Sequence, residues 1–152
     1  MIEKTEQYTR AVEEQRWPPQ PGVPLDHSFA DKRGEIRNLL LTPITSVAEI
    51  TSVRGSVRAN HYHKTDWHYA YVVSGKVLYF ERGLGDEDVP EPTAFYPGEM
   101  FFTPPMVEHA MLFAEDSKII TFARNVRSHD NHEADLVRVE VVTPAVVDKY
   151  LP

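Results

Sequence analysis

The chain has 152 residues, of which 41% are hydrophobic and 26% charged, and its formal net charge at pH 7 is −7. This composition is typical of one soluble globular domain, and the negative charge disfavours a nucleic-acid backbone as partner. Because the chain contains no cysteine, disulfides and thiolate chemistry are excluded. Any metal would have to be held by nitrogen and oxygen ligands.

The sequence also predicts where the protein works. It has no apolar run close to the ~20 residues that a bilayer span needs. The opening residues, MIEKTEQYTR, lack the apolar centre of a secretory signal. We therefore expect a cytoplasmic protein with no membrane partner.

The N-terminal part, residues 1–35, is expected to form a helix followed by an extended arm. Residues 2–16 contain good helix formers and few turn residues, which predicts a short polar helix. The next eight residues, WPPQPGVP, contain four prolines, which forbid a helix and favour a polyproline-like arm. The arm is either a surface spacer or a segment that binds a partner.

Residues 36–143 are expected to form an all-β domain, followed by a C-terminal tail over 144–152. Short runs rich in Val, Ile, Tyr and Phe follow one another, with turn residues between them and no helix-length amphipathic segment. This pattern predicts an antiparallel sandwich or barrel rather than alternating strands and helices. Residues 83–93, GLGDEDVPEPT, are expected to form a solvated loop, with a functional lid as the alternative.

Three of the seven histidines lie within eight residues, in HYHKTDWH. On a strand, His61 and His63 project to the same side. His68 follows the turn KTD and can face the same interior. Imidazole nitrogens bind Fe, Ni, Zn or Cu, so this crowding predicts a site for a divalent transition metal.

The spacing around these histidines resembles the two sequence motifs of the cupin superfamily, G-x5-H-x-H-x(3,4)-E-x6-G and G-x5-P-x-G-x2-H-x3-N. The first motif aligns with residues 55–75 and the second with residues 98–113. The resemblance implies an all-β double-stranded β-helix, also called a jelly-roll barrel, of the small RmlC-like type. It also implies that His61, His63 and His109 are metal ligands.

The chain departs from these motifs at three positions. His68 stands where the family has Glu, which suggests a four-histidine metal site, or alternatively a pocket role for His68. Met106 replaces a glycine, which suggests a different turn, and Phe113 replaces an asparagine. The side chain of Met106 can reach the mouth of the barrel, and strand alternation places four further apolar residues on the same face as the histidines. We expect this set to line a substrate pocket or else to be barrel core. The set is Met106 with Ala70, Val72, Met111 and Phe113.

The remaining three histidines carry less information. His129 and His132 lie in the polar stretch RSHDNHEAD, where we expect a solvated loop. The sequence assigns no role to His27.

Fold alone does not determine the reaction, and three functions remain open. Short phrases such as VRGSVRANHYHK are similar to cupins of deoxysugar and surface-polysaccharide biosynthesis, which suggests a sugar or nucleotide-sugar isomerase or epimerase. The four histidines favour a metal-dependent form of this chemistry; in the metal-free alternative, His61 or His63 would be the general base. The alternatives are an Fe(II) dioxygenase and a non-catalytic metal-containing binding module. Each would take a small-molecule ligand, and the catalytic residues stay unassigned.

We also expect a homodimer. An open edge of the barrel needs a cover, and the proline arm is long enough to reach a neighbouring chain.

Overall fold

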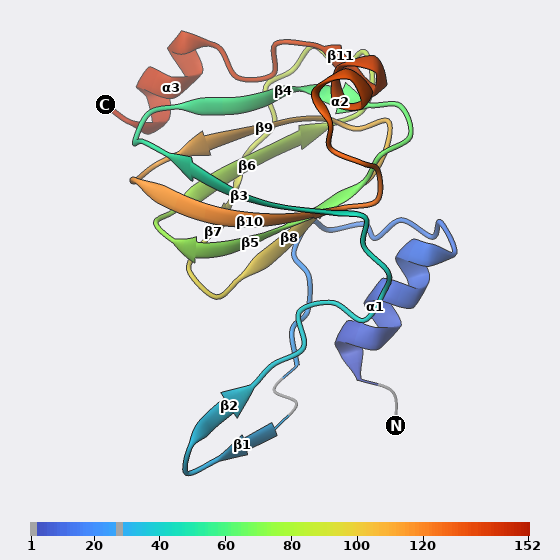
Figure 1. Ribbon diagram of the computed structural model, residues 1–152. Coiled ribbons are helices and arrows are strands. Elements are labelled where there is room, and N and C mark those ends of the chain that lie inside the picture. The colour runs from blue at the N-terminus through green and yellow to red at the C-terminus, as the bar shows by residue number, and fades with distance from the viewer. Residues whose placement is uncertain (1–2, 27–28) are drawn as a thin grey trace.

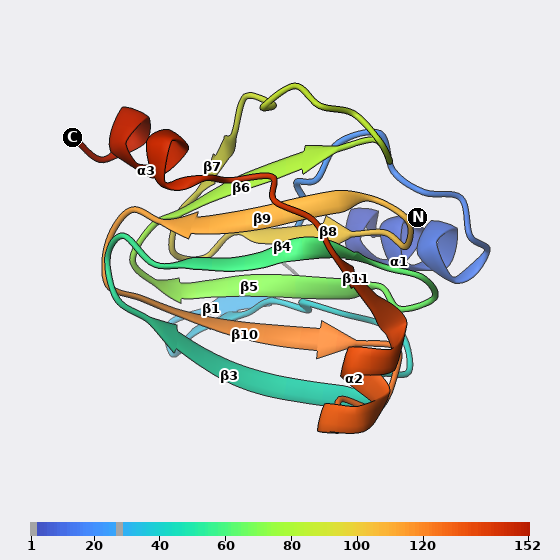
Figure 2. The ribbon, with the colours of Figure 1, turned by 90° about the horizontal axis from the view of Figure 1, so that it is seen from above.

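Two antiparallel sheets face each other and form a jelly roll in the computed structural model, which describes residues 3–26 and 29–152 (Figure 1 and Figure 2). One sheet has the strand order β3-β10-β5-β8 and the other the order β11-β4-β9-β6-β7. The strands of the first sheet are β3 (Ser46–Ser52), β5 (His68–Ser74), β8 (Met100–Thr103) and β10 (Ser117–Ala123). Those of the second are β4 (Val57–His63), β6 (Val77–Arg82), β7 (Thr93–Phe95), β9 (Glu108–Phe113) and β11 (Leu136–Arg138). The all-β jelly roll expected from the sequence is confirmed.

The core between the sheets follows from the alternation of side chains along each strand. On β5, Ala70 and Val72 point inward and are fully buried, whereas Tyr69 packs on the opposite face. The inner cluster consists of Ala70, Val72, Val77, Tyr79, Phe95, Phe101, Met111, Phe113 and Ile119. This interior is therefore large, apolar and rich in aromatic rings.

Short helices cover the outer faces of both sheets. Helix α1 (Lys4–Glu13) lies within the helix expected over 2–16, and its Val12 packs with Tyr69 and Phe102 on the outside of the four-stranded sheet. Helix α3 (Pro144–Tyr150) occupies the region expected to be a tail, and its Val146 packs on the outside of the five-stranded sheet. No helix among the described residues is long and apolar enough to cross a bilayer.

The proline arm lies on the barrel of its own chain. Gly22 bridges Phe101 of β8, the Val23 N–H donates to the Met100 carbonyl, and the Phe102 N–H donates to the Pro21 carbonyl. The arm therefore covers the edge of the four-stranded sheet at β8. This geometry differs from the expectation that the arm would reach a neighbouring chain.

A small hairpin that the sequence did not predict stands apart from the barrel. Among the described residues, strands β1 (Phe29–Asp31) and β2 (Gly34–Ile36) pair only with each other, and Figure 1 shows them projecting away from the two sheets. Phe29 and Ile36 are 50% and 62% exposed. Because an isolated two-stranded hairpin is marginally stable in water, this hairpin presents apolar side chains that need a partner surface.

Candidate functional site

A β-bulge in β4 orients the histidine pair. The register of β4 against β9 shifts between Ala59 and His61, and both Ala59 (φ 71°) and Asn60 (φ 52°) adopt left-handed backbone. The Asn60 side chain stabilises this bulge, since it accepts hydrogen bonds from the Val141 and Val142 N–H groups and donates to the Val142 carbonyl. A bulge re-aims the side chains that follow it, and here those are His61 and His63.

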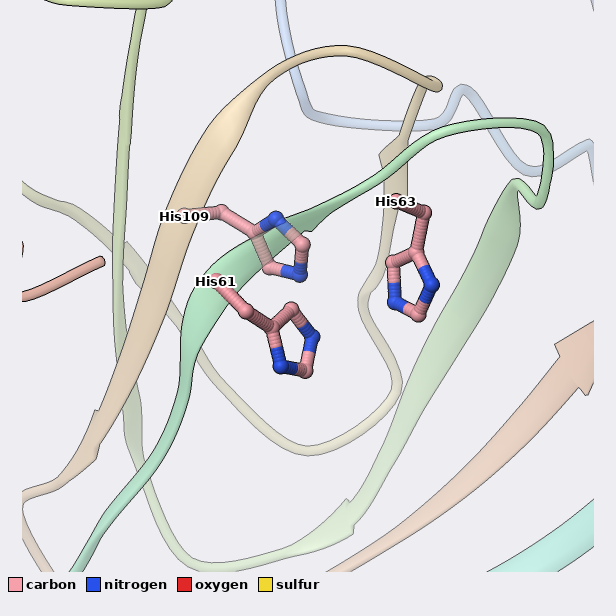
Figure 3. Close-up of side chains that lie close together, drawn as sticks. All are labelled: His61, His63 and His109. Atoms are coloured by element: carbon pink, nitrogen blue, oxygen red, sulfur yellow. The ribbon is translucent and has the colours of Figure 1, made fainter. Parts of the chain in front are cut away.

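Three histidines converge at one end of the barrel. His61 pairs with His109 across β4 and β9, and one ring nitrogen from each of His61, His63 and His109 lies within 4.8 Å of the others. Figure 3 shows the three rings side by side, two from β4 and one from β9. All three side chains are buried. The structure thus brings together the three residues that the resemblance implied as ligands.

The orientation of His109 is fixed by the backbone. Its Nδ1 lies 2.9 Å from the Val107 carbonyl oxygen. A carbonyl can only accept, so Nδ1 carries the hydrogen and Nε2 has the free lone pair. Nε2 is buried and has no hydrogen-bond partner among the described residues. A buried, unpartnered ring nitrogen is costly unless another atom can bind it.

Burial keeps these histidines neutral. Desolvation, together with the neighbouring histidines, lowers the pKa of His61 to about 2. Desolvation lowers the pKa of His63 to about 4 and that of His109 to about 3. Metal ligation requires the neutral ring, so the site is ready to bind across the physiological pH range.

His68 lies beside this cluster. Its ring centroid is 5.6 Å from those of both His63 and His109, and desolvation lowers its pKa well below the ordinary value. Its nitrogens do not belong to the group of ligand atoms within 4.8 Å. Its role as a fourth ligand stays a prediction.

Helix α2 (His129–Asp135) brings a fifth histidine to the site, which the sequence analysis missed. The ring of His132 lies 6.0 Å from that of His61 and 5.4 Å from that of His63. The expectation of a solvated loop is therefore wrong for His132, although His129 is exposed as expected. Ser128 could have indicated the helix, because it is a favoured N-cap residue and its side chain accepts from the Asn131 N–H.

A carboxyl group that no motif indicated also faces the interior. Glu81 of β6 pairs with His109 of β9, so His61, His109 and Glu81 form one row across the sheet. The Tyr79 hydroxyl donates to Glu81 Oε2 at 3.2 Å and lies 2.7 Å from Thr103 Oγ1. Desolvation raises the pKa of Glu81. The site therefore has a carboxyl group, held by a buried tyrosine, beside the histidines.

Two cavities open near this end of the barrel. A cavity of about 350 Å³ is lined by Glu81 and by Trp17 and Pro18 of the arm, among others. A larger cavity of about 1530 Å³ lies between α1, the β4–β5 loop and α2. Its charged lining residues are Glu13, Lys64, Arg124 and Asp135, and Trp17 lines both cavities.

The residues expected to line a substrate pocket divide into two groups. Ala70, Val72, Met111 and Phe113 belong to the packed interior and line neither of these two cavities. Met106 lines the larger cavity and is 47% exposed. The backbone of Met106 has φ 61°, which is the left-handed conformation that favours glycine. The expectation that Met106 in place of the motif's glycine would give a different turn is therefore wrong for the backbone conformation at this position.

No family model and no curated protein matches the chain, but solved structures do. QdtA, a sugar 3,4-ketoisomerase from Thermoanaerobacterium thermosaccharolyticum in complex with TDP, superposes with a TM-score of 0.57 at 18% identity, over 83% of this chain and 92% of its own. The dTDP-4-dehydrorhamnose 3,5-epimerase from Sulfolobus tokodaii gives 0.52 at 20% identity, over 68% and 69% of the two chains.

A third similar structure is the capsular polysaccharide assembling protein CapF from Staphylococcus aureus. Its TM-score is 0.53 at 25% identity over 78% of this chain. The match covers only 35% of CapF, so this chain corresponds to about a third of that protein. Its two facing sheets and these superpositions show that the chain has an RmlC-like jelly-roll fold.

Proposed function

We propose that His61, His63 and His109 hold a divalent transition metal, with His68 as the fourth ligand. Support comes from the convergence of three ring nitrogens and from the buried, unpartnered Nε2 of His109. An all-imidazole donor set suits Fe, Ni, Zn or Cu rather than Mg or Ca. The residues present therefore fit such an ion.

We further propose that the chain is a sugar isomerase or epimerase that acts on a keto sugar carried by a nucleotide. The observation that carries this proposal is the row His61–His109–Glu81, which places a carboxyl group next to the metal-binding nitrogens. The similar structures named above include a ketoisomerase and an epimerase of such sugars. Lys64 and Arg124, which line the larger cavity together with Glu13 and Asp135, offer two cationic contacts for the phosphates of such a substrate.

The chemistry requires an acidified C–H and a group that moves the proton. A divalent metal, when bound, would polarise a carbonyl oxygen and acidify the adjacent C–H. Glu81 then removes that proton from the carbon beside the carbonyl, while Tyr79 holds the carboxyl in place. In an isomerisation, Glu81 returns the proton to the former carbonyl carbon, while the hydroxyl proton of the first carbon passes to the former carbonyl oxygen. In an epimerisation, Glu81 keeps the proton it removed and water delivers another to the opposite face of the same carbon.

The test measures metal content and proton exchange in the same preparations. Wild-type protein reconstituted with Fe, Ni, Zn or Cu is expected to hold about one ion per chain. With TDP-4-keto-6-deoxyglucose in D2O, NMR is expected to show deuterium entering beside the carbonyl. His61→Ala and His109→Ala should lose both properties. Glu81→Gln should keep the metal but lose the exchange.

The matched control is His129→Ala, which removes an exposed histidine of α2 and should behave as wild type. Bound iron with O2 consumption and no exchange would instead support a dioxygenase. Tight ligand binding without turnover would support a non-catalytic module. A chain that binds no metal after reconstitution would contradict the metal site itself.

We also propose that the chain forms a homodimer through the β1–β2 hairpin and the open edge of β3. Within the part of the chain that the structure describes, β3 pairs only with β10, and Val47 of β3 is 65% exposed. Light scattering at micromolar concentration should give twice the monomer mass. The double variant Phe29→Asp, Ile36→Asp should be monomeric, and the control Leu84→Asp, in the exposed 83–93 loop, should remain dimeric. A monomeric wild type would refute this proposal.

A further inference from the structure

Helix α2 ends with a carboxylate that points at one of the proposed metal ligands. Oδ2 of Asp135 lies 3.3 Å from Nδ1 of His63, and their side chains are only 12% and 3% exposed. The backbone brings them together, because β11 begins immediately after Asp135 and pairs Leu136 with His63. The Lys64 N–H also donates to the Asp135 carbonyl oxygen.

Three donors of the β4–β5 loop hold this carboxylate in place. The Thr65 N–H and hydroxyl donate to Oδ1 at 3.0 and 2.6 Å, and the Asp66 N–H donates to Oδ2 at 3.0 Å. Because all three of these groups donate, both oxygens of the Asp135 carboxylate are acceptors in fixed positions.

An ionised carboxylate can only accept, so the nearest nitrogen of a neutral His63 is favoured as the one that carries the hydrogen. At 3.3 Å the contact is not aligned as a full hydrogen bond, and Nδ1 of His63 has no other partner among the described residues. Electrostatic attraction between N–H and carboxylate therefore selects the tautomer. The lone pair is then on Nε2, as it is in His109, where the Val107 carbonyl selects the same tautomer.

We propose that Asp135 is a positioning residue for His63: it holds the ring with hydrogen on Nδ1 and leaves Nε2 free to bind the metal. The predicted effect of Asp135 on metal affinity rests on the metal site of the proposed function, whereas its predicted effect on the tautomer of His63 does not. Outer carboxylates of this kind fix the ring and raise the basicity of the ligand, and their loss lowers metal affinity by about 10–100-fold.

The first test reads the tautomer directly in metal-free protein. In wild type labelled with 15N-histidine, the His63 signals, assigned by their loss in His63→Gln, are expected to show protonated Nδ1 and unprotonated Nε2. In Asp135→Asn the amide keeps one oxygen for Thr65 but turns donor hydrogens toward His63, which should shift the ring toward the Nε2–H form. Asp130→Asn makes the same charge change on an exposed residue of α2 and should leave the signals unchanged.

The second test measures affinity for Co²⁺ and Zn²⁺ by competition with a chelator. Asp135→Asn should bind each ion about 10–100-fold more weakly, Asp135→Glu should recover part of the loss, and Asp130→Asn should match wild type. A wild-type His63 with hydrogen on Nε2 would overturn the proposal without any variant, as would an unchanged tautomer in folded Asp135→Asn. A wild-type protein that binds no metal but carries the hydrogen of His63 on Nδ1 would contradict the proposed metal site and would support the positioning role of Asp135.

Discussion

Acidification from pH 7 to pH 5 is expected to destabilise the metal-free protein by several kcal/mol. In the folded chain, desolvation lowers the pKa of His61, His63 and His109 to about 2, 4 and 3. In the unfolded chain a histidine titrates near 6.5. Between these values the unfolded state binds more protons, so the free energy of unfolding falls as the pH falls below about 6.5.

The size of the effect follows from the number of buried rings. Each ring contributes up to about 1.4 kcal/mol per pH unit, hence about 2 kcal/mol between pH 7 and pH 5. Buried Asp66 and Glu81 have raised pKa values and act in the opposite direction, because their folded forms bind protons more readily. The three histidines outnumber these two carboxyl groups, so the free energy of unfolding increases as the pH rises from 5 to 7.

Urea unfolding at pH 7, 6 and 5 in the presence of a chelator measures this slope. The control His109→Gln removes one titrating ring, so its stability should depend less steeply on pH than that of wild type. A free energy of unfolding that stays constant from pH 7 to pH 5 would contradict the burial of neutral histidines. Metal added at pH 7 should raise the midpoint, since an ion that binds only the folded state stabilises it.

The sequence was sufficient to predict whatever depends on local periodicity. Alternation along a strand placed His61 with His63, and Ala70 with Val72, because neighbouring side chains on a strand point to opposite faces. The resemblance of the intervals from Gly55 to His109 to the cupin motifs then implied the jelly roll. These features need no knowledge of which strands are neighbours.

The sequence was insufficient for features that depend on tertiary pairing. Glu81 reaches the site because β6 pairs with β9, and no spacing along the chain specifies that neighbour. His132 and Asp135 reach it because β11 carries the end of α2 to the end of β4. Short polar stretches such as RSHDNHEAD give little periodic signal, so a solvated loop was the natural expectation.

Gly75 of the first motif is expected to be required for folding rather than for chemistry, and Gly75→Ala should cost more than about 3 kcal/mol of stability. Its φ is +90°, and an added Cβ would lie 2.1 Å from Ser117 Oγ, 2.5 Å from the Asp116 carbonyl oxygen and 2.7 Å from Ser117 Cα. Two of these three atoms belong to the backbone, so no side-chain rotation relieves the clash. Urea unfolding of the variant measures the cost.

Gly55→Ala separates backbone strain from the clash. Gly55 has nearly the same φ, +89°, but nothing lies within 4 Å of its added Cβ, so only the left-handed strain of about 1–2 kcal/mol applies. Adding Ser117→Ala to the Gly75→Ala variant should recover little of the lost stability, because the Asp116 carbonyl oxygen and Ser117 Cα still lie too close to the added Cβ. Equal costs for the two glycine variants would refute the close approach of the β5–β6 turn to Ser117. If the costs differ as expected, the interval between His68 and Gly75 reflects the packing of the β5–β6 turn against Ser117 at the start of β10.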